Sequence, residues 1–269
     1  MYVVGDVHGH RAPLISALRS AGLVDGDTRW SGGDATVWFL GDFVDRGPDG
    51  IGVIDLVMDL AEDAREAGGR VDTLLGNHEI LLLGTHRFGD AEVPSDNGLV
   101  GRSFERSWRM NGGLASDQAA LTAEHIGWLT ERPVLELVGD HLLMHSDTVE
   151  YLTWGDDIES INAGVREVLT GDDLTAWWEV WRRLTTRYAF RGGDGAEVAD
   201  RLLGVLGGSR LVHGHSVIAD QLGVAPPDID GPVLYADGRA LGIDGGVFIG
   251  GPCLVVELPF VGAAEANQV

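Results

Sequence analysis

Hydrophobic and polar positions follow two alternating periods along the first 75 residues of the chain. Short apolar runs at 2–4, 35–40 and 71–75 are bounded by glycine or polar residues, which is typical of buried strands. Between them, apolar residues recur every three or four positions over 13–21 and 51–61, and this spacing predicts a helix in each interval. The alternation predicts βαβ units and a parallel sheet that presents its ligand-binding loops at the carboxyl ends of its strands.

The remainder of the chain is less regular. We expect a loop-rich insertion at 85–113, a helix at 116–129, a hairpin from 134–138 and 142–144, helices within 162–206, a strand at 211–213 and a second sheet region at 233–258. Three tryptophans lie close together within the helical stretch, and we interpret them as core rather than as a cap. We therefore predict one α/β domain over 1–261, with 86–113 and 151–206 as insert or cap-like segments and 262–269 as a frayed tail.

Composition narrows the classes of partner. Acidic side chains number 42 and basic ones 19, which gives a net charge of −23 and disfavours nucleic acid and anionic membranes as partners. The sequence has no apolar run long enough to span a membrane, and Met1–Gly5 does not resemble a secretory signal. The single cysteine, Cys253, excludes an intrachain disulfide and any thiolate metal cluster. These features predict a cytoplasmic protein, while its oligomeric state cannot be read from the sequence.

Polar clusters follow each of the first three predicted strands. Gly5-Asp6-Val7-His8-Gly9 follows the first strand, Gly41-Asp42-Phe43-Val44-Asp45-Arg46-Gly47 the second, and Gly76-Asn77-His78-Glu79 the third. An isolated Gly-Asp pair, such as Gly89-Asp90, is more typical of a turn or a helix cap. Because three clusters occur in this order, each directly after a strand, they predict a metal site at one edge of the sheet.

The three clusters resemble the GDxHG, GDxxDRG and GNHE signatures of the phosphoprotein phosphatase branch of the calcineurin-like metallophosphoesterases. Two later segments, Leu143–Ser146 and Val212–Ser216, resemble the family's histidine segments, and Ile243–Gly246 resembles its closing segment. The resemblance covers residues 1 to about 258. It implies an α/β fold, a four-layer α/β/β/α sandwich with a dimetal site at the carboxyl ends of its strands.

The resemblance also implies a ligand set for two cations. Asp6 and His8 would hold one ion, Asn77, His145 and His215 would hold the other, and Asp42 would bridge them. This mixture of imidazole, amide and carboxylate groups suits divalent transition metals better than Ca²⁺, with Mn²⁺ favoured and Fe or Zn²⁺ as alternatives. Some relatives use both histidines of a Gly-His-x-His segment; we favour His215 as the ligand and place His213 behind it.

The same resemblance assigns roles in a hydrolytic reaction. Two cations can lower the pKa of a shared water, so that a bridging hydroxide attacks the phosphoryl group in line. His78 would protonate the leaving oxygen, Asp45 would orient His78, and Arg46 would offer its planar fork to phosphate oxygens. A second phosphate-binding arginine is expected among Arg182, Arg183, Arg187 and Arg191. We choose Arg187, because Thr186–Phe190 resembles the corresponding stretch of Shewanella-like phosphatases.

Three functions compete at this point. The leading hypothesis is a metal-dependent phosphomonoester hydrolase, a serine/threonine protein phosphatase acting on phosphoproteins or small phosphoesters. The first alternative is a symmetrical dinucleoside tetraphosphate hydrolase; such enzymes typically carry Gln where this chain has His8. The second alternative is a noncatalytic phosphate-binding scaffold, which is disfavoured because no proposed ligand position has lost suitable chemistry. Arg87, Arg102, Arg106 and Arg109 of the predicted insertion contact substrate or, as we prefer, solvate the surface.

Overall fold

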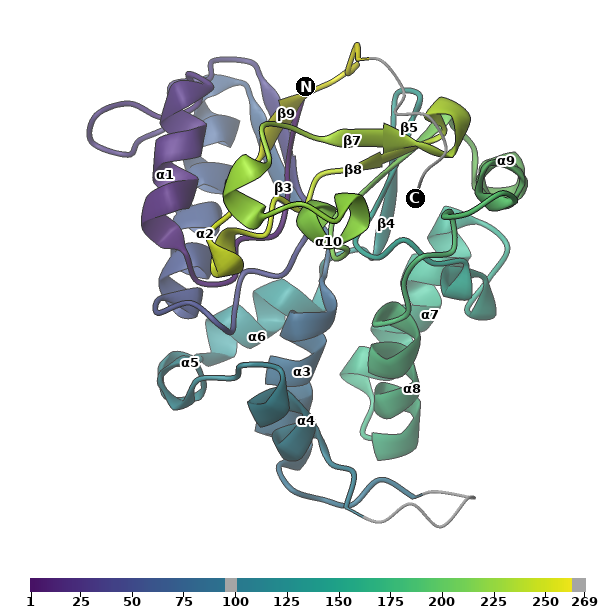
Figure 1. Cartoon of the computed structure of the whole chain (residues 1–269). Coiled ribbons are helices and arrows are strands. Elements are labelled where there is room, and N and C mark those ends of the chain that lie inside the picture. The colour runs from purple at the N-terminus through teal and green to yellow at the C-terminus, as the bar shows by residue number, and fades with distance from the viewer. Residues whose placement is uncertain (95–100, 263–269) are drawn as a thin grey trace.

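Two β-sheets face each other in the computed structural model of the chain, with helices on both outer sides (Figure 1). The structure describes residues 1–94 and 101–262. The first sheet has the strand order β3 (Arg70–Thr73), β2 (Thr36–Phe39), β1 (Tyr2–Val4) and β9 (Val255–Glu257). The second sheet has the order β4 (Leu135–Val138), β5 (His141–Met144), β6 (Arg210–His213), β8 (Ala240–Gly242) and β7 (Val233–Tyr235). This is the α/β/β/α sandwich implied by the sequence.

The register of the strands determines which loops meet. In the first sheet β1 pairs in parallel with β2, and β2 with β3, while β9 runs antiparallel to β1. In the second sheet β5, β6 and β8 are parallel, and β4 and β5 form the predicted hairpin. Met144, the last residue of β5, is directly opposite His213, the last residue of β6. The segments that follow these strands therefore leave each sheet at its carboxyl edge, as expected of parallel strands.

An apolar core fills the space between the two sheets, and it receives every second side chain of their strands. Val3 and Trp38 of the first sheet are buried in the same cluster as Leu143 and Val212 of the second. Their neighbours along the chain belong to a different cluster, which is shared with the helices; Val4, Phe39, Leu142 and Met144 are examples. Successive side chains thus point to opposite faces of each sheet, and both faces are covered.

Ten α-helices lie outside the sheets in the described parts of the chain. They are α1 (Arg11–Ser20), α2 (Gly50–Ala67), α3 (Asn77–Phe88), α4 (Phe104–Met110), α5 (Ala115–Ala120), α6 (Ala123–Thr130), α7 (Ile158–Thr170), α8 (Leu174–Leu184), α9 (Gly195–Leu206) and α10 (Ile218–Leu222). Helices α1 and α2 lie beside the first sheet, and α7 and α9 lie beside the second (Figure 1). Trp177 and Trp178 of α8 are buried against the main core, as the sequence predicted for the tryptophan group.

Two expectations about secondary structure were wrong, and one further segment holds more helix than expected. The loop-rich segment at 85–113 contains the end of α3, which continues to Phe88, and α4 at Phe104–Met110. The helix expected at 116–129 is two helices, because Leu121 leaves the helical conformation and the Thr122 side chain caps α6. The region at 233–258 does not form one sheet, because β9 joins the first sheet beside β1. The tail predicted at 262–269 lies, beyond Gly262, outside the described residues.

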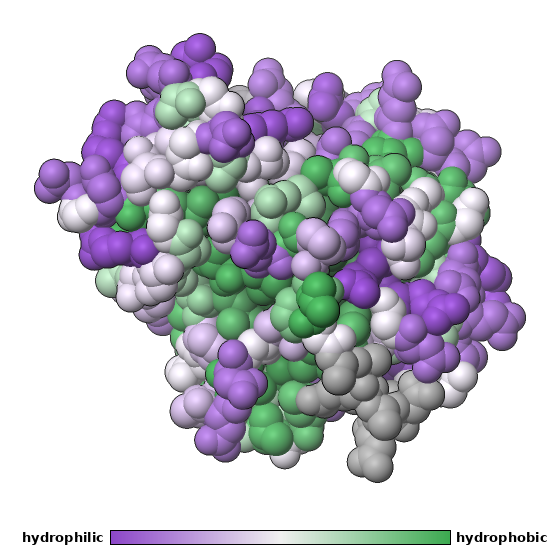
Figure 2. All heavy atoms as spheres, turned by 90° about the horizontal axis from the view of Figure 1, so that it is seen from above, coloured by the Kyte–Doolittle hydropathy of each residue, from purple (hydrophilic) through white to green (hydrophobic). Residues whose placement is uncertain are grey.

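One face of the surface combines polar and apolar regions. Figure 2 views the molecule from the upper side of Figure 1, and polar residues gather along the edges of that face while apolar residues lie nearer its middle. No helix in the described ranges combines the length and apolarity needed to cross a membrane.

We expect Leu143→Ala to lower the free energy of unfolding by about 2–5 kcal/mol, because it removes buried side-chain atoms between the sheets. Leu137→Ala in the same hairpin is the matched control, since Leu137 is 36% exposed and its loss should cost far less. Urea unfolding curves measure both values. Equal destabilisation by the two substitutions would contradict the placement of Leu143 between the sheets.

Candidate metal centre

Segments that follow five strands converge at the edge where the two sheets meet. Asp6 and His8 follow β1, Asp42 follows β2, and Asn77 begins α3 after β3. From the second sheet, His145 follows β5 and His215 follows β6. Each of these six side chains, the predicted ligand set, is at most 5% exposed. The structure therefore brings together every residue that the sequence proposed as a metal ligand.

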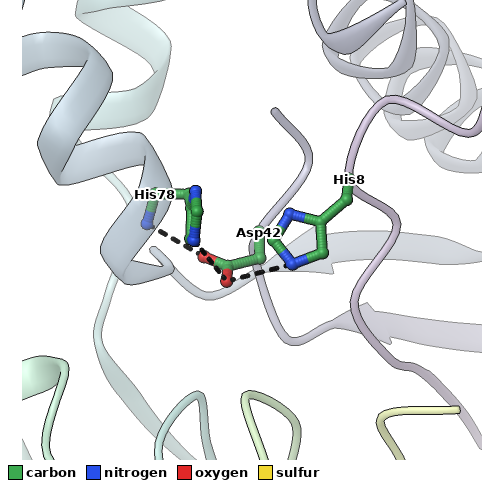
Figure 3. Close-up of side chains that lie close together, drawn as sticks. All are labelled: His8, Asp42 and His78. Atoms are coloured by element: carbon green, nitrogen blue, oxygen red, sulfur yellow. Dashed lines mark hydrogen bonds and ion pairs between the residues drawn. The ribbon is translucent and has the colours of Figure 1, made fainter. Parts of the chain in front are cut away.

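Asp42 lies at the centre of this group. Its Oδ2 atom is 3.6 Å from Nε2 of His8 and 4.0 Å from Nε2 of His78, and Figure 3 shows the carboxylate between the two imidazoles. Its Oδ1 atom faces the second sheet and lies 3.3 Å from Nε2 of His145. Potential ligand atoms of His8, Asp42 and His78 lie within 4.8 Å of one another, as do those of Asp42, His145 and His215. Asp42 can thus contribute to two adjacent cation sites.

The other members of the set close the group on both sides. Oδ2 of Asp6 lies 3.9 Å from Nε2 of His8, and its carboxylate accepts a hydrogen bond from the backbone nitrogen of His215 at 3.0 Å. Oδ1 of Asn77 lies 2.9 Å from Nε2 of His145. Asp6 therefore joins the β1 loop to the β6 loop, and the two sheets contribute to one site.

Backbone carbonyl groups fix the rings of three histidines. Nδ1 of His8 donates to the oxygen of Val44 at 3.0 Å, and Nδ1 of His145 donates to that of Leu40 at 2.9 Å. Nε2 of His215 donates to the oxygen of Thr185 at 3.1 Å. A carbonyl can only accept, so the nitrogen that carries the proton is defined in each ring. In His8 and His145 the second nitrogen, Nε2, then faces Asp42, which is the arrangement that metal-binding imidazoles need.

Unusual backbone conformations are concentrated at the same edge. His8, Asp42 and His215 have φ angles of 45°, 53° and 62°, in a region that residues with a side chain rarely occupy. Asp45 and Arg46 follow with 68° each. Such conformations persist only where the surrounding structure holds them, and they cluster at functional sites. They aim several side chains from short loops at one point.

The electrostatics of the cluster favour positive charge. Burial, followed by the neighbouring charge of Asp244, raises the pKa of Asp6 well above its usual value. Burial also raises the pKa of Asp244 to about 6, and its Oδ2 atom has no hydrogen-bond partner within the described residues. Burial opposes protonation of His145, yet the charges of Asp42 and other nearby acids raise its pKa to about 9. A group of buried carboxylates short of compensating charge fits divalent cations.

Two of the proposed imidazole ligands favour their neutral form. Burial, and then the charge of His78, lowers the pKa of His8 well below its usual value. Burial, followed by His145 and Arg187, does the same for His215. A neutral imidazole has a free lone pair for a metal, so both rings are in the protonation state that coordination requires.

Beside the cluster, His78 and Arg46 form a second group. Nδ1 of His78 donates to Oδ2 of Asp45 at 2.7 Å. The Arg46 guanidinium donates to Nε2 of His8 at 2.9 Å and to Nε2 of His78 at 3.1 Å. It also lies 4.0 Å from the ring centre of Phe248, in the short 3₁₀ helix Val247–Ile249. The fork of Arg46 is thus held at the edge of the predicted metal site, beside His78.

The four arginines considered as a second phosphate ligand differ in their partners. Arg182 pairs with Glu179, Arg183 pairs with Glu150 and Glu179, and Arg191 donates to Gln221. Arg187 is exposed and forms no ion pair within the described part of the chain, and its charge acts on His215. The next residue, Tyr188, holds the backbone in place, because its backbone nitrogen donates to Oδ2 of Asp147 at 2.9 Å. Of the four, Arg187 is the one whose guanidinium forms no hydrogen bond or ion pair within the described residues, so it stays the candidate.

Several residues that shape the site have no role in the sequence-based prediction. The Glu79 carboxylate accepts hydrogen bonds from the backbone nitrogens of Asp42, Phe43 and Gly76, and so joins the second and third motifs. Its position in the third motif, three residues after a helix start, was a signal that could have predicted this capping role. Asp244 is buried beside the cluster. His213 points elsewhere, since its ring nitrogens contact Gly214 O and Tyr235 Oη.

Comparisons with known proteins agree with this geometry. The calcineurin-like phosphoesterase family matches residues 1–219, a span that contains all six proposed ligands. Shewanella-like protein phosphatase 2 of Arabidopsis thaliana is 25% identical over 263 residues, covering 81% of this chain and 66% of that protein. The symmetrical bis(5'-nucleosyl)-tetraphosphatase of Bordetella pertussis is 29% identical over 146 residues, covering 54% and 43%. The chain thus spans less than two thirds of the length of either relative.

A crystal structure of the cold-active protein tyrosine phosphatase of a psychrophilic Shewanella species has the same fold. It superposes with a TM-score of 0.69 at 20% identity, covering 94% of this chain and 73% of that one.

We expect Gly214→Ala to reduce bound metal, because a Cβ there would lie 2.1 Å from Oδ1 of Asp6 and would displace that carboxylate. Gly204→Ala in α9 is the control, since a Cβ at that position meets no atom within 4 Å. The metal content of purified protein, measured by inductively coupled plasma mass spectrometry, compares the two with the wild type. Unchanged metal content in Gly214→Ala would argue against Asp6 as a ligand.

Proposed function

This chain belongs to the calcineurin-like phosphoesterase family, and from that premise we propose that it is a metal-dependent phosphomonoester hydrolase acting on phosphorylated serine or threonine in proteins. The observation that carries the proposal is the convergence of the six proposed ligands around Asp42, with His78 and Arg46 beside them. The similarity to a plant protein phosphatase over 81% of the chain supports a protein substrate.

The residues divide into two cation sites that share Asp42. Asp6 and His8 would hold one cation, and Asn77, His145 and His215 would hold the other, which would leave His78 free for acid catalysis. Divalent cations at these positions lower the pKa of water and neutralise charge on phosphoryl oxygens. Manganese as the metal, a cytoplasmic location and the exclusion of nucleic acid as a partner stay predictions from the sequence.

The chain's own side chains act on the leaving group and on the phosphate. The Asp45 carboxylate, which accepts from Nδ1 of His78, fixes the orientation of that ring. Nε2 of His78 accepts from Arg46 in this structure, and it delivers a proton to the leaving oxygen once Arg46 binds phosphate instead. Arg46 has two N–H groups in one plane, and these can donate parallel hydrogen bonds to two oxygens of one phosphate. Arg187 approaches from the segment beside His215 and adds positive charge.

A nucleotide substrate is the second candidate, supported by the similarity to symmetrical tetraphosphatases over 54% of the chain. We disfavour it because His8 stands where those enzymes typically have Gln, and because a net charge of −23 repels free polyphosphates. Assays with both kinds of substrate distinguish the two functions. A phosphoserine peptide should be the better substrate, whereas preferential cleavage of diadenosine tetraphosphate would overturn the protein phosphatase assignment.

We predict that His78→Asn lowers kcat on a phosphoserine peptide by about 100-fold or more while metal content stays at the wild-type level, because the general acid is lost and the ligands remain. Both quantities are measured on protein loaded with Mn²⁺. Loss of metal together with activity would instead make His78 a ligand, which its position within 4.8 Å of His8 and Asp42 also permits.

Arg46→Lys should lower kcat/KM by about 10-fold or more, since the lysine keeps the charge but cannot donate two parallel hydrogen bonds to phosphate. Arg201→Lys in α9 is the control, because Arg201 pairs with Glu197 on the exposed surface. Steady-state kinetics with p-nitrophenyl phosphate measure the effect. Wild-type kinetics in Arg46→Lys would refute a bidentate role.

A further inference from the structure

The segment at 104–117, which runs from α4 to the first turn of α5, contacts the Asp45–Arg46 dipeptide at three points. Nε1 of Trp108 donates to Oδ1 of Asp45 at 2.7 Å. The backbone nitrogen of Arg46 donates to the oxygen of Gly112 at 2.8 Å, and that of Asp45 donates to Oδ2 of Asp117 at 3.4 Å. This segment lies more than fifty residues further along the chain, so the contacts are purely tertiary.

Those contacts act where the backbone is under strain. Asp45 and Arg46 are consecutive residues with side chains, and each has a φ of 68°. A left-handed conformation costs about 1–2 kcal/mol for each such residue, and the surrounding structure must supply it. Gly112 is close enough that a Cβ there would lie 2.8 Å from Cγ of Arg46, which shows how tightly the segment packs on the dipeptide.

Trp108 differs from the other two contacts because it reaches the reactive group. Asp45 divides its two oxygens between Trp108 at Oδ1 and Nδ1 of His78 at Oδ2, both at 2.7 Å. All three side chains are at most 3% exposed, so water does not replace either hydrogen bond. With Oδ1 held by the indole, the carboxylate cannot rotate, and the plane of the His78 ring is fixed in turn.

We propose that Trp108 is a positioning residue for proton delivery, which acts through Asp45 on His78. The inference rests on the proposed function, because it assumes that His78 protonates the leaving oxygen. The α4 end of the predicted insertion thus supports the reactive groups from behind.

Trp108→Phe tests the inference, because it retains a ring in the core and removes the N–H. Trp178→Phe is the matched control: Trp178 is 5% exposed, packs 5.4 Å from the ring centre of Phe104 and has no indole partner within the described residues. We expect Trp108→Phe to lower kcat on a phosphoserine peptide about 10-fold with little change in KM. The loss on p-nitrophenyl phosphate should be much smaller, since nitrophenolate leaves without a proton. Trp178→Phe should leave both rates near wild type.

Equal losses on the two substrates, or wild-type rates in Trp108→Phe, would overturn the proposal. A measurement on the wild-type protein keeps it testable if Trp108→Phe does not fold. In protein labelled with ¹⁵N at the tryptophan indoles, the indole N–H proton of Trp108 should exchange slowly with water. The chemical shift of its resonance should change in Asp45→Asn. Fast exchange, or a resonance indifferent to Asp45→Asn, contradicts the hydrogen bond. A wild type inactive on every substrate refutes the proposed function and with it the role in proton delivery, while the indole resonance still tests the Trp108–Asp45 hydrogen bond.

Discussion

The structure depends on keeping several carboxylates buried at one point. Asp6, Asp42, Asp45, Glu79 and Asp244 are each at most 3% exposed, and burial opposes ionisation of every one of them. Such a group is stable only with compensating hydrogen bonds and positive charge. The protein supplies part of this compensation through backbone N–H groups, histidines and the Trp108 indole. The remaining demand for positive charge is what makes the edge suited to cations.

The fold meets this demand with short connections. Each ligand-bearing segment leaves a strand within a few residues, so the strand positions determine where its side chains can lie. Left-handed residues then turn the side chains inward, and glycines with no room for a Cβ, such as Gly214, let the backbone approach the carboxylates. The positions of the side chains at this edge therefore depend on both the sheets and the loops that follow their strands.

Sequence reasoning recovered the parts that local pattern encodes. The strands before Asp6, Asp42 and Asn77 have clear apolar runs, and the three polar clusters follow them directly, so the sheet edge and the meeting of the candidate ligand residues there could be predicted. Trp108 and Asp117 could not be found in this way, because their roles depend on a tertiary contact with Asp45. The position of β9 was missed for a related reason: whether an apolar run joins one sheet or the other depends on which strand edge is open.

The apolar core between the sheets has a bearing on the site that lies at its edge. Because His145 and His215 come from one sheet while Asp6, His8 and Asp42 come from the other, the distances among them report how the two sheets are stacked. A small slide of one sheet over the other leaves every loop intact and still separates the two halves of the site. Substitutions among the facing side chains of the two sheets, far from the reacting atoms, can thus lower the reaction rate although every candidate ligand residue is retained.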